Sequence, residues 1–581
     1  MFADTRIAER YSDRSEPHTK WFFVAELAAF MAIGWPLITL VLSALLFWID
    51  IPISPYHLWA GLLLSLAAGY YLAGDWRAWL IAIILLVITV SLGGIALAWC
   101  YDFSGDGQWY HLPGVLALAK GWNPFLAPQL GEWNTGFEQD LTNAAIYVQH
   151  YAKGVWIVAA AVYRATGQLE AAKIFNLLYL LAVYLITASF LGRLGLSRVW
   201  AHTLALTTAA NPVTLYQMTS FFVDGQLASL CTLSVVLSLD YFRQPRLKTL
   251  VLLGACVVLL INVKFTGLVY AVFLGGGFTV LAWLKDWWEE GRRYAAAGTA
   301  SILLGSLVVG YQPYVTNVMF KGNPFYPAVG RDEAATAATD GQFEMWAPSE
   351  FLDMSRSEKL LRSILARSSG AKSMPEWKIP FTVNKNELYI FFNTEPRFGG
   401  FGPFFGSILV VVLFVYIISR KATKPDRWKA GAGIAVLVVL SVLPNPEAWW
   451  ARLAPQLWLV PLILISALAL GASNWPRKIA GGLLILLLAN STLVAALNWG
   501  RAAEKNLAFR VQLAQLRLIS SSGPLQLSTD PRFRMVTEHR LLTNSILYRL
   551  VDEVSCPQPF RFSYPNPPAR AQAAACPPAG D

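Results

Sequence analysis

The stretch AWLIAIILLVITVSLGGIALAW, residues 78–99, is apolar along its length and contains no charged side chain. A helix needs about 20 such residues to cross the hydrocarbon core of a bilayer. Polar sequence, YDFSGDGQWYH at residues 101–111, follows almost at once. We therefore predict a membrane-spanning helix that ends near residue 99 and delivers a polar loop to one membrane surface.

Similar apolar runs recur along most of the chain and predict thirteen spans. They cover residues 22–48, 56–74, 78–99, 171–192, 199–213, 222–240, 249–263, 266–284, 295–312, 401–419, 430–443, 456–471 and 479–498. A further run, 155–167, is too short and too polar to span, so we expect it to lie on the membrane surface. The predicted fold class is an all-α polytopic membrane protein.

The composition of the 581 residues points the same way. Apolar and aromatic residues make up 55% of the chain and charged residues only 14%, whereas a soluble domain is about a quarter charged. The net charge of +10 would suit a nucleic-acid partner. However, the basic residues lie in short clusters between apolar runs, which is typical of membrane topology signals and argues against nucleic acid.

The loops predict an orientation, because Lys and Arg gather on the cytoplasmic side of membrane proteins. Twenty basic residues fall in loops that we assign inside, and two, Lys264 and Arg452, fall in the short loops assigned outside. Three long segments then lie outside: 100–154, 313–400 and 499–581. Active-site residues of a membrane enzyme are expected there, beside the outer leaflet.

The predicted organisation is a cytoplasmic N-terminus (1–21), a transmembrane domain (22–498) and a small extracytoplasmic module of mixed helix and strand (499–581). Cys556 and Cys576 both lie in this module. An outside location permits a disulfide between them, and two free thiols are the alternative. No metal-ligand spacing of cysteines or histidines is present.

The first outer loop places two carboxylates, Asp102 and Asp106, directly after a span, and Tyr110 and His111 follow one helical turn later. A carboxylate at the membrane surface can act as a general base toward an acceptor hydroxyl. Asp and Gly are also common turn residues, and in isolation the loop supports both interpretations.

The loop resembles the first outer loop of the GT-C superfamily, multi-spanning glycosyltransferases that use lipid-linked sugars. The matching features are an acidic residue just after a span, Tyr-His on a surface helix, and Gly-x-Asn-Pro. Further short segments resemble bacterial members and extend the likeness over about residues 100 to 460. They are 149–154, 211–212 with 222–225, 264–267, 322–327, 399–403 and 450–452.

The resemblance implies that the acidic residue of this loop is the catalytic base, which falls on Asp106 with Asp102 as its neighbour or substitute. Most members carry Asp-Glu here, whereas this chain has Asp106-Gly107, so the choice between the two carboxylates stays open. The Trp-Trp-Asp signature of oligosaccharyltransferases is absent, because Ala451 follows Trp450, and en-bloc glycan transfer is disfavoured.

The leaving group of such a reaction is a lipid phosphate, whose charge must be met by basic side chains. Lys153, Lys264 and Arg452 are the candidates, because they lie at outer ends of spans where positive charge is otherwise avoided. The alternative for each is an interaction with lipid headgroups.

Four further residues complete the predicted substrate-binding set: Tyr110, His111, His150 and Asp224. The two histidines could bind a divalent metal with Asp106, but hydrogen bonding to a neighbour is the commoner role, and we expect no required cofactor. Asp224 begins a span and is either a substrate contact or a helix N-cap.

These features predict an inverting glycosyltransferase in the bacterial inner membrane, with its active site facing the periplasm. It would move a sugar from a polyprenyl-phosphate donor to a glycan, lipid or protein hydroxyl. A polysaccharide ligase or polymerase is one alternative, and a flippase or transporter of lipid-linked glycans is another. Transporters place ionisable residues near the bilayer midplane, whereas here the charges gather at the ends of the spans.

Overall fold

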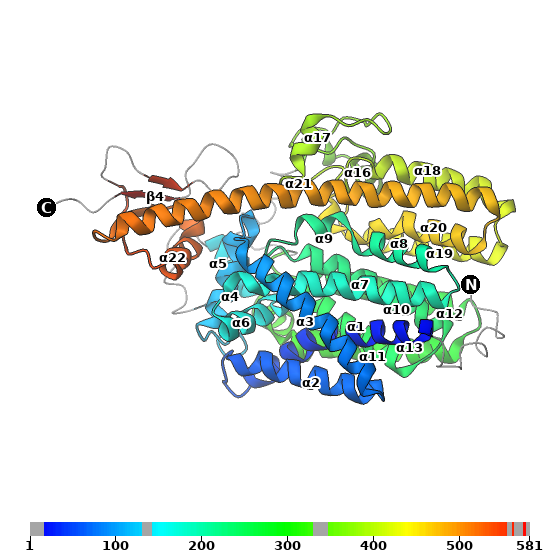
Figure 1. Ribbon diagram of the computed structural model, residues 1–581, viewed down its shortest axis with the longest axis horizontal. Helices are drawn as coiled ribbons and strands as arrows, with labels where there is room; N and C mark the ends of the chain where they lie inside the picture. Colours follow the sequence, from blue (N-terminus) through cyan, green and yellow to red (C-terminus); the bar gives the residue numbers. More distant parts are fainter. Residues whose placement is uncertain (1–16, 131–141, 329–346, 555–559, 563–572, 577–581) are drawn as a thin grey trace.

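The computed structural model describes residues 17–130, 142–328, 347–554, 560–562 and 573–576. Its long helices lie side by side in one bundle, with a smaller group of helices and a sheet at one end (Figure 1). The long helices are α1 (Pro17–Phe47), α2 (Pro55–Ala73), α3 (Trp76–Trp99), α7 (Ile174–Arg193), α8 (Arg198–Ala209), α10 (Asp224–Arg243), α11 (Leu247–Val263), α12 (Phe265–Trp283), α13 (Trp288–Leu303), α18 (Phe405–Ile418), α19 (Pro425–Val442), α20 (Leu459–Gly471) and α21 (Asn474–Ser520).

Within the described residues, seven helices are long and apolar enough to cross a membrane, or eight if one bent pair counts as a span. They are Trp21–Phe47, Trp76–Trp99, Leu169–Arg193, Asp224–Arg243, Phe265–Trp283, Phe405–Ala422 and Asn474–Ser520, and the bent pair is Trp288–Val309 with Tyr311–Lys321. These helices mark the chain as a membrane protein. The other predicted spans are helices that are shorter or less apolar, such as α8 and α11, so the count of thirteen stays a prediction.

Burial separates the helices into a core and a periphery. All of the most apolar stretch of α10 is buried, against 11% of that of α3. In a membrane, α10 is therefore surrounded by protein, whereas α3 presents its apolar side chains to lipid. The turn between α2 and α3 is local: Gly74 adopts φ 59°, and Asp75 accepts a hydrogen bond from the backbone N–H of Arg77.

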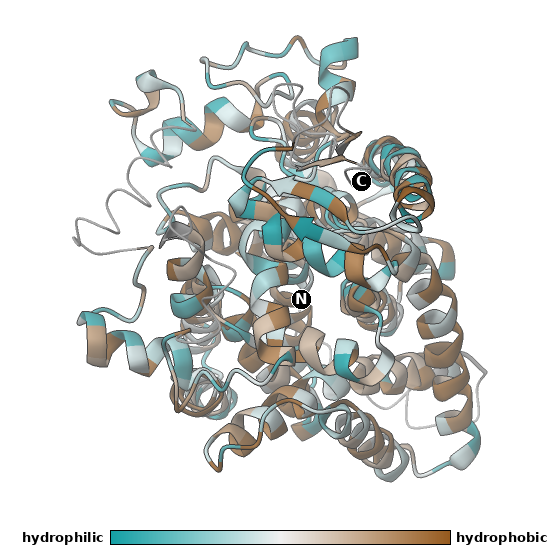
Figure 2. Ribbon diagram, turned by 90° about the vertical axis from the view of Figure 1, so that its left-hand side faces the viewer, coloured by the Kyte–Doolittle hydropathy of each residue, from teal (hydrophilic) through white to brown (hydrophobic). Residues whose placement is uncertain are grey.

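Short helices gather at the end of the bundle where α3 stops. They are α4 (Leu112–Ala119), α5 (Thr142–His150) and α6 (Gly154–Thr166), preceded by a π-helical turn, Gly107–His111. Viewed from this end, the hydrophilic residues lie mainly on the loops and the C-terminal module, whereas the helices behind are largely hydrophobic (Figure 2). The predicted surface helix 155–167 is α6, and it is mostly buried because it packs against α4 and α2.

Other short helices connect the bundle: α9 (Pro212–Tyr216), α14 (Thr316–Lys321), α16 (Arg356–Ile364) and α17 (Lys385–Ile390). Pro212 starts α9, and the side chain of Asn211 caps it by accepting from the N–H of Val213. This cap fixes the turn that leads from α8 toward the start of α10.

The C-terminal module consists of α22 (Arg534–Thr543) and a four-stranded sheet. The strand order is β2 (Tyr548–Leu550), β1 (Leu525–Thr529), β4 (Ala573–Cys576), β3 (Phe560–Phe562). The pair β1–β2 is parallel, and the other two pairs are antiparallel. The prediction of a small mixed module is confirmed. Cys576 is disulfide-bonded, and Cys556, its predicted partner, lies outside the described residues.

The last predicted span and the first helix of this module are one continuous helix. α21 runs over 47 residues without a break at residue 498 and extends beyond the bundle to the sheet (Figure 1). Phe509, Leu513 and Leu516 on its outer part pack against Leu525 and Leu527 of β1. The module is therefore built directly on the final membrane helix.

A cluster of charged side chains lies at the end of the bundle away from the C-terminal module. Arg193, at the end of α7, pairs with Glu26 and with Asp240, 2.8 Å away. Arg246 and Lys248 pair with the same two carboxylates. These basic residues belong to loops that the charge pattern assigns to the cytoplasm.

Candidate functional site

Asp106 lies immediately before the π-helical turn that follows α3, at the module end of the bundle. Its Oδ2 accepts hydrogen bonds from the Tyr110 hydroxyl, at 3.3 Å, and from Arg452 Nη1, at 3.2 Å. The described residues give no hydrogen bond to its Oδ1, and the side chain is 25% exposed. Asp106 is thus oriented through one oxygen while the other remains available to a ligand.

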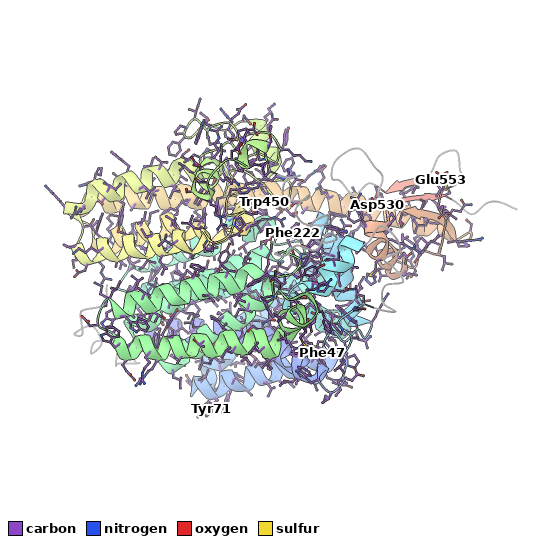
Figure 3. All side chains as sticks on the ribbon, turned by 180° about the vertical axis from the view of Figure 1, so that it is seen from behind. Phe47, Tyr71, Phe222, Trp450, Asp530 and Glu553 are labelled. Carbon is purple, nitrogen blue, oxygen red and sulfur yellow. The ribbon has the colours of Figure 1, made fainter. Side chains whose placement is uncertain are left out.

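Arg452 is at the centre of the site. It lies in the short turn Ala451–Leu453 between α19 and α20, and its side chain is 11% exposed. The guanidinium contacts Asp106, Asp224 at 3.4 Å and Glu395 at 3.6 Å. It also lies over the rings of Trp450 and Phe222, 4.2 and 5.0 Å from their centroids; both residues are labelled in Figure 3.

Asp224 joins a second cation to this arrangement. Its carboxylate is fully buried in the first turn of α10 and accepts from Lys264 Nζ at 2.7 Å and from Gln217 Nε2 at 3.2 Å. The N-cap position of α10 is Val223 and Asp224 is the first residue of the helix, so the N-cap interpretation is wrong. Lys264 lies between α11 and α12 and is 17% exposed. The Lys264 ammonium is therefore partly accessible to a ligand, and its ion pair with Asp224 holds it in place.

Glu395 is a member of the site that the sequence interpretation missed. Burial and the nearby Asp106 and Asp224 carboxylates raise the pKa of Glu395 to about 7, although Arg452 acts to lower it. The same acids hold the pKa of Arg452 above its ordinary value despite its burial. Glu395 lies four residues before the 399–403 segment of the resemblance, but nothing in the local sequence marks it as a neighbour of Arg452.

We predict a pH effect on stability from Glu395. Its pKa is 4.5 when unperturbed and about 7 in the folded protein, so the folded state retains a proton that the unfolded chain releases. Stability should therefore fall as the pH rises from about 4.5 to about 7. Thermal unfolding of wild type and Glu395→Gln across pH 4–8 measures this, and identical pH profiles for the two proteins would contradict it.

Asp102 has a different environment from Asp106. It is fully buried, its Oδ1 accepts from the N–H of Ser104 at 2.7 Å, and its Oδ2 accepts from the N–H of Phe221 at 2.8 Å. Burial, with Glu170 nearby, raises the pKa of Asp102. Oδ2 thus ties the first outer loop to the segment before α10, whereas Oδ1 bonds within the loop.

The two predicted histidines, His111 and His150, make no hydrogen bond to the charged residues around Arg452, although His111 packs beside Tyr110. His111 Nδ1 accepts from Trp156 Nε1 at 2.8 Å, and burial lowers its pKa to about 3. His150 Nδ1 lies 2.7 Å from Asn317 Oδ1, and burial lowers the pKa of His150 to about 4. Both imidazoles are therefore neutral at pH 7. Among the described residues no group of three His, Cys, Asp or Glu is placed to hold a metal ion.

Lys153 is 1% exposed, so it does not reach lipid headgroups. Its Nζ donates to the carbonyls of Gln149 and Tyr151, both at 2.9 Å, and lies between the rings of Trp122 and Trp156. Burial lowers the pKa of Lys153 well below its ordinary value. Its observed role is to hold the start of α6.

The C-terminal module holds the first outer loop through Arg540. This buried side chain on α22 donates to Gln108 Oε1 at 3.1 Å, to the carbonyl of Asp102 at 2.7 Å and to Glu170 Oε1 at 3.0 Å. Lys173 also pairs with Glu170, at 2.7 Å. Residues from two distant parts of the chain, 170–173 and α22, thus fix the loop that carries Asp106.

Replacing Arg540 with Met should lower the free energy of unfolding by about 3–5 kcal/mol, because it breaks a buried ion pair. Tryptophan fluorescence during thermal unfolding measures the change. Arg534→Met is the matched control on the same helix: Arg534 pairs with Glu538 at 2.9 Å, both are partly exposed, and about 0–1 kcal/mol is expected. Equal effects of the two variants would contradict the anchoring role.

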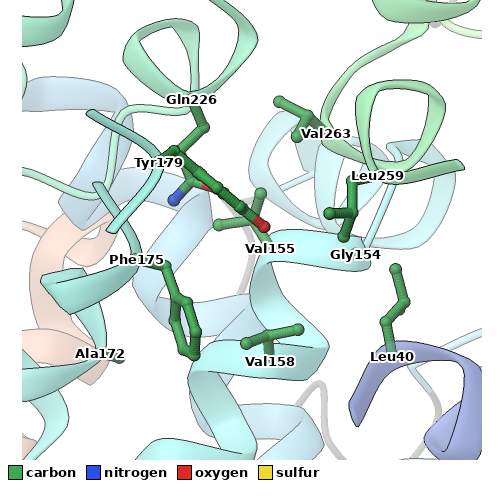
Figure 4. Close-up of a pocket in the computed structure, with 10 residues that line it drawn as sticks. All are labelled: Leu40, Gly154, Val155, Val158, Ala172, Phe175, Tyr179, Gln226, Leu259 and Val263. Carbon is green, nitrogen blue, oxygen red and sulfur yellow. The ribbon is translucent and has the colours of Figure 1, made fainter. Parts of the chain in front are cut away.

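A cavity elsewhere in the bundle does not share this chemistry. It has a free volume of about 320 Å³ between α1, α6, α7, α10 and α11, and its lining is mainly aliphatic and aromatic. Figure 4 shows Tyr179 extending across it, with Gln226 beside it. The lining contains no ionisable acid or base apart from the Tyr179 phenol, so we do not consider it a catalytic site.

The candidate site is therefore a compact charge cluster at the module end of the bundle. It combines one accessible carboxylate oxygen on Asp106, a half-buried acid, Glu395, and two cations held by a buried Asp224. Such a cluster can accept a proton and bind an anion at neighbouring positions. Comparisons of this chain with protein-family models, curated proteins and solved structures gave no match.

Proposed function

We propose that this protein is an inverting glycosyltransferase of the GT-C type that uses a polyprenyl-phosphate sugar. The observation that carries the proposal is the position of Arg452, which contacts Asp106 on one side and the Asp224–Lys264 pair on the other. A carboxylate base and a pair of cations are the groups that this reaction requires. They adjoin one another at one end of an apolar bundle.

Arg452 and Lys264 would bind the phosphate of the donor. Both cations keep donors beyond those used by Asp224, and a guanidinium can bind two phosphate oxygens at once. Negative charge grows on the phosphate as the glycosidic C–O bond breaks, so fixed cations stabilise the transition state more than the ground state. Asp224 positions the two cations rather than contacting the substrate.

Asp106 would act as the general base. The acceptor hydroxyl transfers its proton to Asp106 as its oxygen attacks the anomeric carbon, and the bond to the phosphate oxygen breaks on the opposite face. Configuration at the anomeric carbon is inverted, and the products are the glycosylated acceptor and polyprenyl phosphate. Asp106 is preferred to Asp102 because both oxygens of Asp102 are occupied by backbone N–H groups.

The membrane arrangement follows from the charge pattern. With basic loops on the cytoplasmic side, the site faces the periplasm of a bacterial inner membrane in a thirteen-span protein. The apolar side chains of the bundle would let the lipid tail of the donor enter sideways from the outer leaflet.

Turnover by the purified protein tests the proposal. The protein is incubated with a panel of radiolabelled polyprenyl-phosphate sugars and acceptor extracts, and free polyprenyl phosphate is separated from intact donor. Release that depends on the protein is the expected result. If no donor is consumed while lipid-linked glycan crosses proteoliposome membranes intact, the protein is a flippase and the proposal fails.

A further inference from the structure

A cleft lies beside the site, between α21 and the loops that carry Asp102 and Glu395. The space of about 390 Å³ along it includes open solvent, so a ligand bound there would be only partly enclosed.

The cleft is joined to the site through Gln217. Its amide nitrogen donates to Asp224 Oδ2 at 3.2 Å and to the carbonyl of Thr394, a residue of the cleft lining, at 3.3 Å. Glu395 follows Thr394 directly, and Ser104 of the lining lies two residues before Asp106. A ligand in the cleft is thus adjacent to the reacting groups.

The cleft lining is polar on one side. Ser104 is 2% exposed and lies next to Asp102 beneath the cleft surface. Thr219 and Asn393 add a hydroxyl and an amide to the lining, and Phe392 adds an apolar ring face, a combination suited to a sugar.

The cleft also contains one cation, Lys505 of α21. Its side chain is half-buried, and in the described part of the chain no carboxylate lies within ion-pair distance of it. The nearest acid in sequence, Glu504, is paired with Arg501 at 2.6 Å, and both oxygens of Asp102 accept backbone N–H groups. Lys505 therefore lacks the negative partner that a half-buried ammonium normally has.

The cleft is also on a different side of the site from the proposed donor cation Lys264. Lys264 joins α11 and α12, whereas Lys505 belongs to α21. These elements lie along opposite sides of the bundle in Figure 1. A donor phosphate at Lys264 and a ligand at Lys505 could therefore be bound at the same time.

We propose that this cleft binds an anionic sugar of the acceptor, with Lys505 paired to its carboxylate or phosphate. The proposal rests on the proposed glycosyl transfer, and it names the acceptor class for that reaction. Thr219 and Asn393 bind the sugar hydroxyls, and Phe392 packs against the ring. The acceptor hydroxyl is then presented toward Asp106.

Binding to the full-length purified protein tests this without turnover. Saturation-transfer NMR titrations use glucuronic acid, glucose 6-phosphate and neutral glucose as probes, so the carboxylate and phosphate sources are separated. Lys505→Met should weaken binding of at least one anionic probe by about 10- to 100-fold and leave glucose unchanged. Arg517→Met is the matched control, because Arg517 is exposed farther along α21, and it should have no effect.

The outcomes are distinct. Equal binding by wild type and Lys505→Met, or no preference for an anionic probe over glucose, would overturn the cleft proposal whatever the turnover assay shows. Binding that depends on Lys505 in a protein that consumes no polyprenyl-phosphate donor would instead keep the anionic-sugar site and reject the proposed transferase. In an active enzyme, Lys505→Met should raise KM for the acceptor and leave KM for the donor unchanged.

Discussion

Asp106→Asn is expected to reduce glycosyl transfer by about 10²- to 10⁴-fold, the usual contribution of a general base. Asparagine keeps the size of the side chain and can still accept from Tyr110 and Arg452, but its amide takes no proton from the acceptor. The loss should appear in kcat, with the donor affinity nearly unchanged. Initial rates with labelled donor at saturating acceptor measure it.

Asp353→Asn is a suitable control for this variant, since Asp353 is exposed and is not among the site residues; its rate should match wild type. Asp102→Asn makes a useful contrast. It should lower the unfolding temperature, because Asp102 accepts two backbone N–H groups in a buried position. Full activity of Asp106→Asn would show that Asp106 is not the base.

Arg452→Lys is expected to lower kcat/KM for the donor by about 10²- to 10³-fold, a typical cost of losing an electrostatic stabiliser in an active site. Lysine keeps the charge but cannot contact Asp106, Asp224 and Glu395 together or bind two phosphate oxygens. The defect should be visible in donor binding as well as in the rate. Equilibrium binding of a polyprenyl-phosphate sugar to purified protein measures the donor affinity.

Arg356→Lys provides the matched control for this substitution. Arg356 is an exposed residue of α16 that donates to the carbonyls of Leu443 and Pro444, so its replacement should leave donor binding unchanged. Donor binding by Arg452→Lys equal to that of wild type would remove Arg452 from the phosphate site.

Much of the site was identifiable in the sequence as separate residues. Asp106, Asp224, Lys264 and Arg452 were each selected for their position at an outer end of a span, and the fold brings them into contact. What the sequence could not provide was the pairing between them, because Asp106 and Arg452 are 346 residues apart. Glu395 was missed because nothing local indicates that an acid in a long outer loop will fold back against Arg452.

For Lys153 and His111, the sequence predicted substrate binding where the structure shows buried side chains. Lys153 and His111 follow the same pattern of a polar residue near a span end, yet their side chains are buried against tryptophans. Local sequence does not distinguish such structural roles from substrate binding, since both place a polar group beside an apolar helix. Likewise, hydropathy located the last span at 479–498 but did not show that the same helix, α21, continues to Ser520.

The central claim is that the phosphate of a lipid-linked donor binds between Arg452 and Lys264. A cryo-electron microscopy structure of the purified protein with bound polyprenyl phosphate tests it most directly. The account predicts phosphate density within hydrogen-bond distance of both cations, with Asp106 beside it and the lipid tail along the bundle. Phosphate density instead at the opposite end, against Arg193, Arg246 and Lys248, would contradict it.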